Sequence, residues 1–124
     1  MKLGLVGYGR MGREIETIAV SRGHEIGVRF DIEGPRVETS SLSGVEVLVD
    51  FSVPGAVLST LKTAASCRIP VVEGTTGWGE DLDEACEIKG LTMVHSPNFS
   101  PGVYVLMQLV RSAARQLGCI QGYD

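Results

Sequence analysis

The chain has 124 residues, of which 44% are hydrophobic and 21% are charged, and its formal net charge is −4. This composition and length fit one globular domain with its own core. Charges are spread without blocks, which gives no reason to expect binding to nucleic acid or to an anionic membrane. Apolar stretches fall far short of the roughly 18 residues of a membrane span, and no signal-peptide pattern opens the chain. We therefore expect a cytoplasmic protein.

A glycine-rich turn follows the first predicted strand. Residues 2–6 form an apolar run, and residues 10–22 carry apolar side chains at helical spacing. Between them lies a Gly-x-Gly-x-x-Gly motif, Gly7-Tyr8-Gly9-Arg10-Met11-Gly12. Its glycines allow a tight turn, close approach of a pyrophosphate and close packing of the helix on the sheet. The helix N-terminus favours an anion, and Arg10 adds a positive charge nearby.

A second strand is predicted at residues 24–30, and Asp31 follows it, nineteen positions after Gly12. A carboxylate at this spacing is placed to accept hydrogen bonds from the ribose of an adenosine. Taken alone, the glycine motif is compatible with an ordinary turn, and Asp31 with a solvated turn residue. Strand, turn, helix, strand and acid in this order together favour a dinucleotide site.

The rest of the chain alternates strands and helices. Residues 32–44 are polar and rich in helix breakers, which predicts a loop beside the adenosine, with at most a short helix. Strands are expected at 45–50, 69–73 and 91–95, and helices at 54–67, in the acidic segment that begins at 80, and at 101–117 between the N-cap Ser100 and Gly118. This order predicts an α/β fold, a Rossmann-type parallel sheet with helices on both faces, over residues 1–124.

Cysteine and methionine residues are expected at positions in the core. The three cysteines are odd in number and widely spaced, which indicates free thiols rather than disulfides or a metal site. We expect these thiols to be buried. The residues concerned are Cys67, Cys86 and Cys119, and the methionines expected in the core are Met11, Met93 and Met107.

Four segments in order give the chain a family resemblance: Gly9-Arg10-Met11-Gly12-Arg13, Asp50-Phe51-Ser52, Gly74-Thr75-Thr76-Gly77, and Ser96-Pro97-Asn98-Phe99-Ser100 running on through Gly102-Val103. With them, essentially the whole chain resembles the N-terminal domain of the dihydrodipicolinate reductase family. That family uses NADH or NADPH to reduce a cyclic dicarboxylate in lysine and diaminopimelate biosynthesis. The resemblance implies an NAD(P)H-dependent oxidoreductase that is a homo-oligomer at full length.

The resemblance also implies roles for individual residues. The glycine turn would hold the pyrophosphate, Asp31 the adenosine ribose, and residues 74–76 and 96–99 the nicotinamide end of the cleft. No residue of this chain is assigned a catalytic role. The expected cofactor-binding residues are Gly7, Tyr8, Gly9, Arg10, Met11, Gly12, Asp31, Phe51, Gly74, Thr75, Thr76, Ser96, Pro97, Asn98 and Phe99.

Two departures from the family pattern lead to expectations about the cofactor and about substrate turnover. The family often places a basic residue after the acid of the second strand, whereas Ile32 and Glu33 follow Asp31, so NADH is the expected cofactor and NADPH the alternative. The family also continues into a substrate domain with a His-His-x-x-x-Lys signature, which neither His24 nor His95 matches. The chain is thus expected to lack that domain, through which the dicarboxylate binds, and to bind cofactor without turnover.

A different function class is also compatible with this fold. A standalone nucleotide-binding or redox-sensing Rossmann module would use the same glycine turn without catalysis. Such a module is expected to expose an apolar surface to its partner, for instance on the final helix. A reductase portion is expected to expose one where its missing domain docks.

Overall fold

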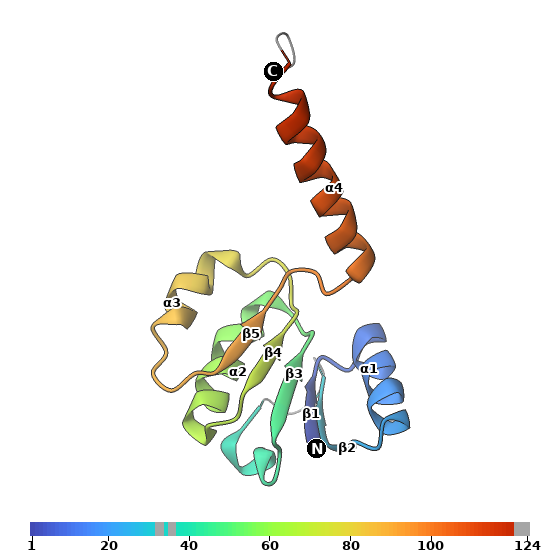
Figure 1. The fold of residues 1–124 in the computed structure, drawn as a ribbon. Helices are drawn as coiled ribbons and strands as arrows, with labels where there is room; N and C mark the ends of the chain where they lie inside the picture. Colours follow the sequence, from blue (N-terminus) through green and yellow to red (C-terminus); the bar gives the residue numbers. More distant parts are fainter. Residues whose placement is uncertain (32–33, 35–36, 121–124) are drawn as a thin grey trace.

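The computed structural model describes residues 1–31, 34 and 37–120. Strands and helices alternate along the chain (Figure 1). In order, the elements are β1 (Lys2–Val6), α1 (Arg10–Ser21), β2 (Glu25–Phe30), the 3-10 helix η1 (Thr39–Leu42), β3 (Val47–Asp50), α2 (Pro54–Cys67), β4 (Val71–Glu73), the 3-10 helix η2 (Gly79–Asp81), α3 (Leu82–Cys86), β5 (Met93–His95) and α4 (Pro101–Leu117).

The five strands form one parallel sheet in the order β2-β1-β3-β4-β5. The chain builds the sheet in one direction from β1 to β2 and then in the other from β3 to β5. The reversal lies between β1 and β3, and in such sheets ligands bind outside the carboxyl ends of the strands at this point. The predicted α/β class with a parallel sheet is confirmed.

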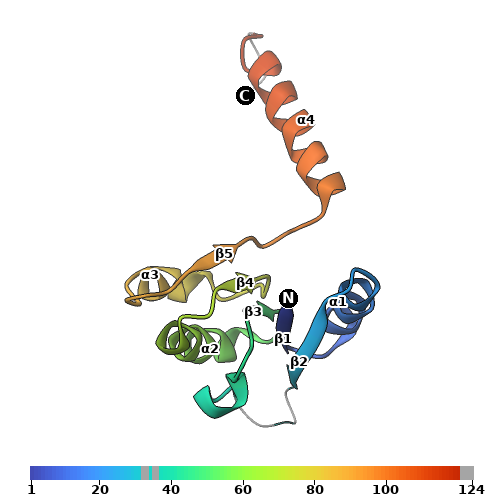
Figure 2. The same cartoon turned by 60° about the horizontal axis from the view of Figure 1, so that its bottom comes forward.

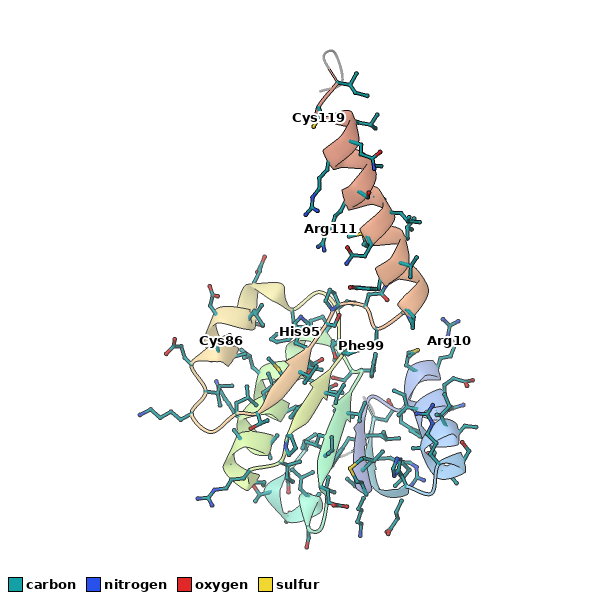
Figure 3. All side chains as sticks on the ribbon, in the orientation of Figure 1. Arg10, Cys86, His95, Phe99, Arg111 and Cys119 are labelled. Carbon is teal, nitrogen blue, oxygen red and sulfur yellow. The ribbon has the colours of Figure 1, made fainter. Side chains whose placement is uncertain are left out.

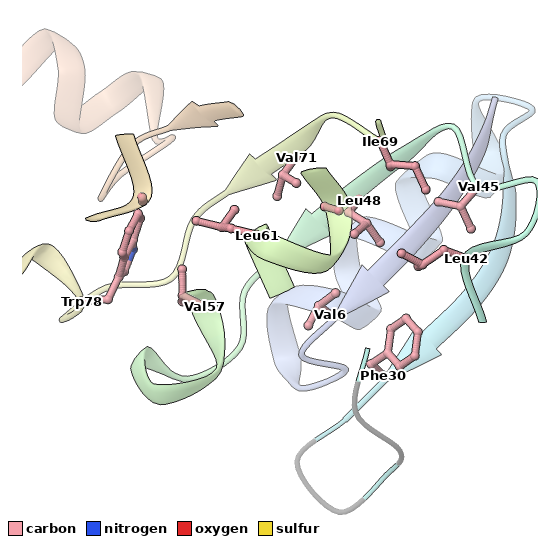
Figure 4. Close-up of a cluster of buried hydrophobic side chains, with 12 residues drawn as sticks. Val6, Phe30, Leu42, Val45, Leu48, Val57, Leu61, Ile69, Val71 and Trp78 are labelled. Atoms are coloured by element: carbon pink, nitrogen blue, oxygen red, sulfur yellow. The ribbon is translucent and has the colours of Figure 1, made fainter. Parts of the chain in front are cut away.

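Helices lie on both faces of the sheet, with α1 on one side and α2 and α3 on the other (Figure 2). The larger core lies between the sheet and α2, where Leu48, Val57 and Leu61 are completely buried (Figure 4). Each such side chain contributes roughly 1.5–3 kcal/mol through removal of apolar surface from water. On the opposite face, α1 forms a smaller core, to which it contributes the buried residues Gly12 and Ala19. The packing of helices on both faces of the sheet therefore fixes the positions of the carboxyl ends of the strands.

Three strands begin two residues later than the apolar runs predict, because the first residues of each run close the preceding turn. The N–H of Val45 donates to the carbonyl of Leu42, that of Ile69 to Ala64, and that of Leu91 to Ile88. The predicted bounds of α2 are confirmed, with a proline in its first turn. The loop predicted before β3 contains the short helix η1, and its residues 32, 33, 35 and 36 lie outside the described residues.

Helix α4 has the predicted bounds but extends away from the sheet (Figures 1 and 2). The hydroxyl of Ser100 accepts from the N–H of Val103, which confirms the predicted N-cap. Residues 101–120 are all exposed, including large apolar side chains such as Tyr104, 66% exposed, and Leu109, 63% exposed. Among the described residues, no helix is both long and apolar enough to cross a membrane.

Several core assignments from the sequence are wrong. Met107 and Cys119 are exposed because they belong to the part of the chain that leaves the sheet with α4 (Figure 3). Cys86 is exposed because it ends α3 on the surface, and Met11 is 47% exposed because it follows the glycine turn at the rim of a cavity. Met93 is partly buried against the core.

Candidate functional site

In the glycine turn between β1 and α1, two glycines lie against backbone atoms and the third borders open space. Gly7 has φ +83°, and a β-carbon there would overlap the backbone carbonyl of Phe51. A β-carbon on Gly12 would overlap the carbonyl of Gly7. By contrast, apart from Gly9 itself and its chain neighbours, no described atom lies within 4 Å of a β-carbon built on Gly9, whose φ is −80°. Gly7 and Gly12 are thus needed by the fold, and Gly9 borders open space at the start of the helix.

The first N–H groups of α1 are available to bind an anion. Its N-cap is Gly9, and within the described chain no side chain caps it and no acidic residue lies in its first turn. The leading N–H groups of a helix need partners, and an anion satisfies them. Arg10 stands at this end of α1, toward solvent (Figure 3).

A cavity of about 360 Å³ lies on one side of this turn, a volume typical of small-molecule pockets. Asp31, at the end of β2, lies in its wall, as the ribose prediction requires. Apolar side chains of β1, β2 and the loop before α2 form much of the remainder. The lining residues are Val6, Gly7, Phe30, Asp31, Gly34, Val37, Ser52, Val53, Gly55, Ala56, Ser59 and Thr60.

A second cavity, of about 590 Å³, lies beyond the turn at the ends of β3, β4 and β5. The rings of Phe51 and Phe99 stand in its wall with centroids 6.2 Å apart and planes inclined by 58°. Except for Ser52 and Ser100, its lining residues are all among the cofactor-binding residues expected from the sequence. They are Met11, Phe51, Ser52, Gly74, Thr75, Thr76, Pro97, Asn98, Phe99 and Ser100.

The described walls of the two cavities do not include Tyr8, Gly9, Arg10, Gly12 or Ser96. The Tyr8 hydroxyl donates to Glu16 Oε2 at 2.6 Å, and the Arg29 guanidinium lies 5.6 Å from the ring centroid, so this side chain joins α1 to β2. The Ser96 hydroxyl donates to the carbonyl of Asn98 and accepts from its N–H, which shapes the loop before α4. Contact of these residues with a cofactor stays a prediction.

Two carboxyl groups beneath the second cavity are not among the expected cofactor-binding residues, although Asp50 belongs to one of the four segments of the family resemblance. Asp50 and Glu73 end the neighbouring strands β3 and β4, are register partners, and are both 0% exposed. Burial raises the pKa of Asp50 above its usual value. Burial, and then the charge of Asp50, raise the pKa of Glu73 to about 7. The available signal was an acid as the last residue of an apolar strand, directly before a loop that lines the cavity.

The two carboxyl groups accept hydrogen bonds from the loops after β3 and β4, and Thr75 links the two loops through its hydroxyl. The N–H of Thr75 donates to Glu73 Oε1 at 2.7 Å, and the N–H of Ser52 donates to Asp50 Oδ1 at 2.9 Å. The Ser52 N–H also lies 3.1 Å from Thr75 Oγ1, and the Trp78 indole donates to the Thr75 carbonyl at 2.9 Å. Ser52, which borders both cavities, is therefore fixed from beneath.

Comparisons with known proteins identify the family to which the chain is similar. The model of the family described as dihydrodipicolinate reductase, N-terminus, matches residues 1–99. Three curated relatives carry the name 4-hydroxy-tetrahydrodipicolinate reductase. The relative from Christiangramia forsetii is 36% identical over 129 residues, which cover 100% of this chain and 53% of the relative.

The second relative, from Archaeoglobus fulgidus, is 33% identical over 127 residues, which cover 88% of this chain and 49% of the relative. The third, from Wolbachia pipientis, is 37% identical over 142 residues, which cover 95% of this chain and 53% of the relative. The chain spans about half the length of the curated relatives it matches. Kinship with reductases supports a pyridine nucleotide as the cofactor. The chain belongs to the dihydrodipicolinate reductase family and corresponds to its N-terminal part.

Proposed function

We propose that this chain is the NAD(P)H-binding portion of a 4-hydroxy-tetrahydrodipicolinate reductase, which delivers a hydride to a cyclic dicarboxylate in lysine and diaminopimelate biosynthesis. The observation that carries the proposal is the placement of two cavities on either side of an uncapped helix N-terminus. A dinucleotide has this layout, with two bulky ends joined by a pyrophosphate. The relatives' shared name favours a reductase over a standalone sensing module.

Each part of the cofactor has a place in this arrangement. The pyrophosphate lies at the start of α1, where Gly9 leaves room for it. The adenosine occupies the smaller cavity with its ribose at Asp31, and the nicotinamide occupies the larger cavity between residues 74–76 and 97–99. The nicotinamide ring supplies the hydride, and the chain's own residues bind and orient it. The Phe51 and Phe99 rings shield that end of the site from water.

We propose NADH as the preferred form of the cofactor. The Asp31 carboxylate suits a ribose diol, whereas a 2′-phosphate would bring a second negative charge against it. Arginine is the side chain that most often offsets such a phosphate. Ile32 and Glu33, the next residues in the sequence, supply no cation, although they lie outside the described residues.

We further propose that residues 1–124 form the dinucleotide-binding domain and that the substrate binds through a part of the enzyme that corresponds to the half of the relatives outside the match. Helix α4 supports this, because its apolar side chains are exposed on all sides, as expected for a helix that packs into another domain. A dicarboxylate also needs cationic partners. In the described chain, the lysines Lys62 and Lys89 lie on or beside helices and outside the cavity walls.

Calorimetric titration of the chain with NADH tests the proposal. We expect one NADH per chain, and we expect Gly9→Val to abolish binding because its side chain fills the space of the pyrophosphate. The matched control is Gly79→Val, since Gly79 also has open space around its β-carbon position but belongs to η2 rather than to the N-terminus of α1. Unchanged NADH affinity in Gly9→Val, with Gly79→Val also unchanged, would place the cofactor elsewhere.

A further inference from the structure

The carboxyl groups of Asp50 and Glu73 are buried together without a counter-charge. Both residues are 0% exposed, and their side chains are on the same sheet face because they are register partners. Among the described residues the ion pairs are Lys2–Glu25, Arg29–Glu16 and Lys62–Glu84, and none includes either acid. Two adjacent buried carboxylates without a cation repel each other strongly, so the second acid to ionise does so only with a raised pKa.

Unsatisfied oxygens on the two acids indicate where a proton belongs. Asp50 Oδ1 and Glu73 Oε1 accept backbone N–H groups, whereas Asp50 Oδ2, Glu73 Oε2 and the hydroxyl oxygen of Ser52 are buried and have no hydrogen-bond partner in the described chain. The two carboxyl groups stand side by side, because Asp50 and Glu73 are register partners on neighbouring strands and Thr75 contacts both of them, with its N–H on Glu73 Oε1 and its hydroxyl 3.4 Å from Asp50 Oδ1. A proton on one acid supplies the donor that both free carboxyl oxygens lack, which removes the cost of two unsatisfied buried acceptors.

Among the described residues, one other titratable group is a register neighbour of the pair. His95 of β5 is the register partner of Glu73, but its Nδ1 lies 3.2 Å from the Glu73 backbone carbonyl and its ring packs on Trp78. Across β1 the partner of Asp50 is the apolar Val6, and α2 presents the apolar Val57 and Leu61 to the core. The remaining contacts are to neutral groups of Ser52 and Thr75.

We propose that Asp50 and Glu73 share a single proton and that this acid pair is a positioning element, which fixes the Ser52 and Thr75 loops for the dinucleotide. The positioning role rests on the proposed function, whereas the shared proton does not. Loss of the proton leaves two negative charges side by side beneath the loops, and their repulsion moves the two carboxyl groups apart together with the Thr75 and Ser52 N–H groups bonded to them. Cofactor affinity therefore falls as the proton leaves.

The expected pH dependence follows from the raised pKa of Glu73, about 7 in the folded chain against an ordinary 4.5. Between these pH values the folded chain binds more protons than the unfolded chain, so the contribution of this group to stability is complete below about pH 4.5 and is lost as pH rises through about 7. If only the protonated pair positions the loops, the Kd of NADH rises about tenfold between about pH 6 and about pH 8.

The test compares wild type, Glu73→Gln and His95→Gln. In Glu73→Gln the amide keeps an acceptor for Thr75 and donates permanently to Asp50, so we expect this variant to fold and to lose the pH dependence. His95→Gln is the control and should retain it. Three quantities are followed over pH: the free energy of unfolding in urea, the backbone amide shift of Thr75 by NMR, and the Kd of NADH. Isotope-edited infrared spectra should show a protonated carboxyl band in wild type that is absent in Glu73→Gln.

The outcomes separate this inference from the proposed function. A stability and a Thr75 shift that do not change over this pH range, or that change equally in Glu73→Gln, would overturn the shared proton even if NADH binds. A proton-linked stability with pH-independent NADH affinity would overturn the positioning role. Absence of NADH binding at any pH would overturn the proposed function and the positioning role together, while the unfolding and infrared measurements would still decide whether the proton is shared.

Discussion

The ring of Phe51 lies against Gly74 so closely that a β-carbon at position 74 would overlap the edge of the ring. These residues belong to the loops after β3 and β4, and both line the larger cavity. Glycine at position 74 therefore sets where the Phe51 ring stands in the wall of the proposed nicotinamide site.

Replacement of Gly74 by alanine should displace the Phe51 ring and alter this end of the site selectively. We expect Gly74→Ala to weaken NADH binding by about tenfold and to destabilise the fold by about 1–3 kcal/mol, as overpacking usually does. Binding of ADP, which occupies only the adenosine side, should be unchanged. Calorimetry with NADH and ADP measures the difference, with Gly79→Ala as control. Equal losses for both ligands would contradict this assignment of the cavities.

Asp31 should govern the choice between NADH and NADPH. We expect wild type to bind NADH more tightly, and Asp31→Asn to lower NADH affinity about tenfold, because a hydrogen bond to a charged group contributes roughly 1.5–3 kcal/mol. The preference for NADH over NADPH should narrow in the variant. Asp83→Asn makes the same charge change at an exposed position outside the described cavity walls and should alter neither affinity. Tighter NADPH binding by wild type at low salt would refute the prediction.

The 124-residue chain should bind NADH without oxidising it. Turnover requires cationic contacts for a dicarboxylate and an acid held within roughly 3 Å of the reacting nitrogen, and together these contribute many orders of magnitude in rate. NADH oxidation with a dihydrodipicolinate-type substrate measures this, with the full-length relative from Christiangramia forsetii as positive control. Steady turnover by this chain alone would require an acid within it, and His95, at the end of β5, would be the first residue to test.

Glu16 should contribute to stability in acid, in the opposite direction to Glu73. Hydrogen bonds from Arg29 and then Tyr8 lower the pKa of Glu16 to about 2. The contribution is therefore complete above pH 4.5, the usual value, and is lost as pH falls toward about 2. Urea unfolding over this range should show a smaller loss of stability in Glu16→Gln than in wild type. Glu14→Gln, exposed on the same helix, should behave as wild type, and a similar change in both variants would contradict the prediction.

The elements of this fold were predictable because local chemistry specifies them. Pro54 and Ser100 mark helix starts through their own backbone and side-chain chemistry, and apolar periodicity marks the strands. The glycine motif and Asp31 were found for the same reason, since their spacing along the chain carries the signal.

Features that depend on distant segments were not predictable. The burial of Asp50 and Glu73 follows from the register of two strands and from the loops above them, whereas each acid alone resembles an exposed strand end. Periodicity shows that Met107 lies on an apolar helix face, but it does not show what covers that face. Tyr8 belongs to the glycine motif, yet its side chain bonds to Glu16 on α1.

A crystal structure of the chain with NADH tests the central claim most directly. The account predicts the pyrophosphate at the N-terminus of α1 beside Gly9, the adenosine ribose on Asp31, and the nicotinamide ring between Thr75 and Asn98 in the larger cavity. A dinucleotide bound elsewhere on the chain, or with its pyrophosphate away from the glycine turn, would contradict it.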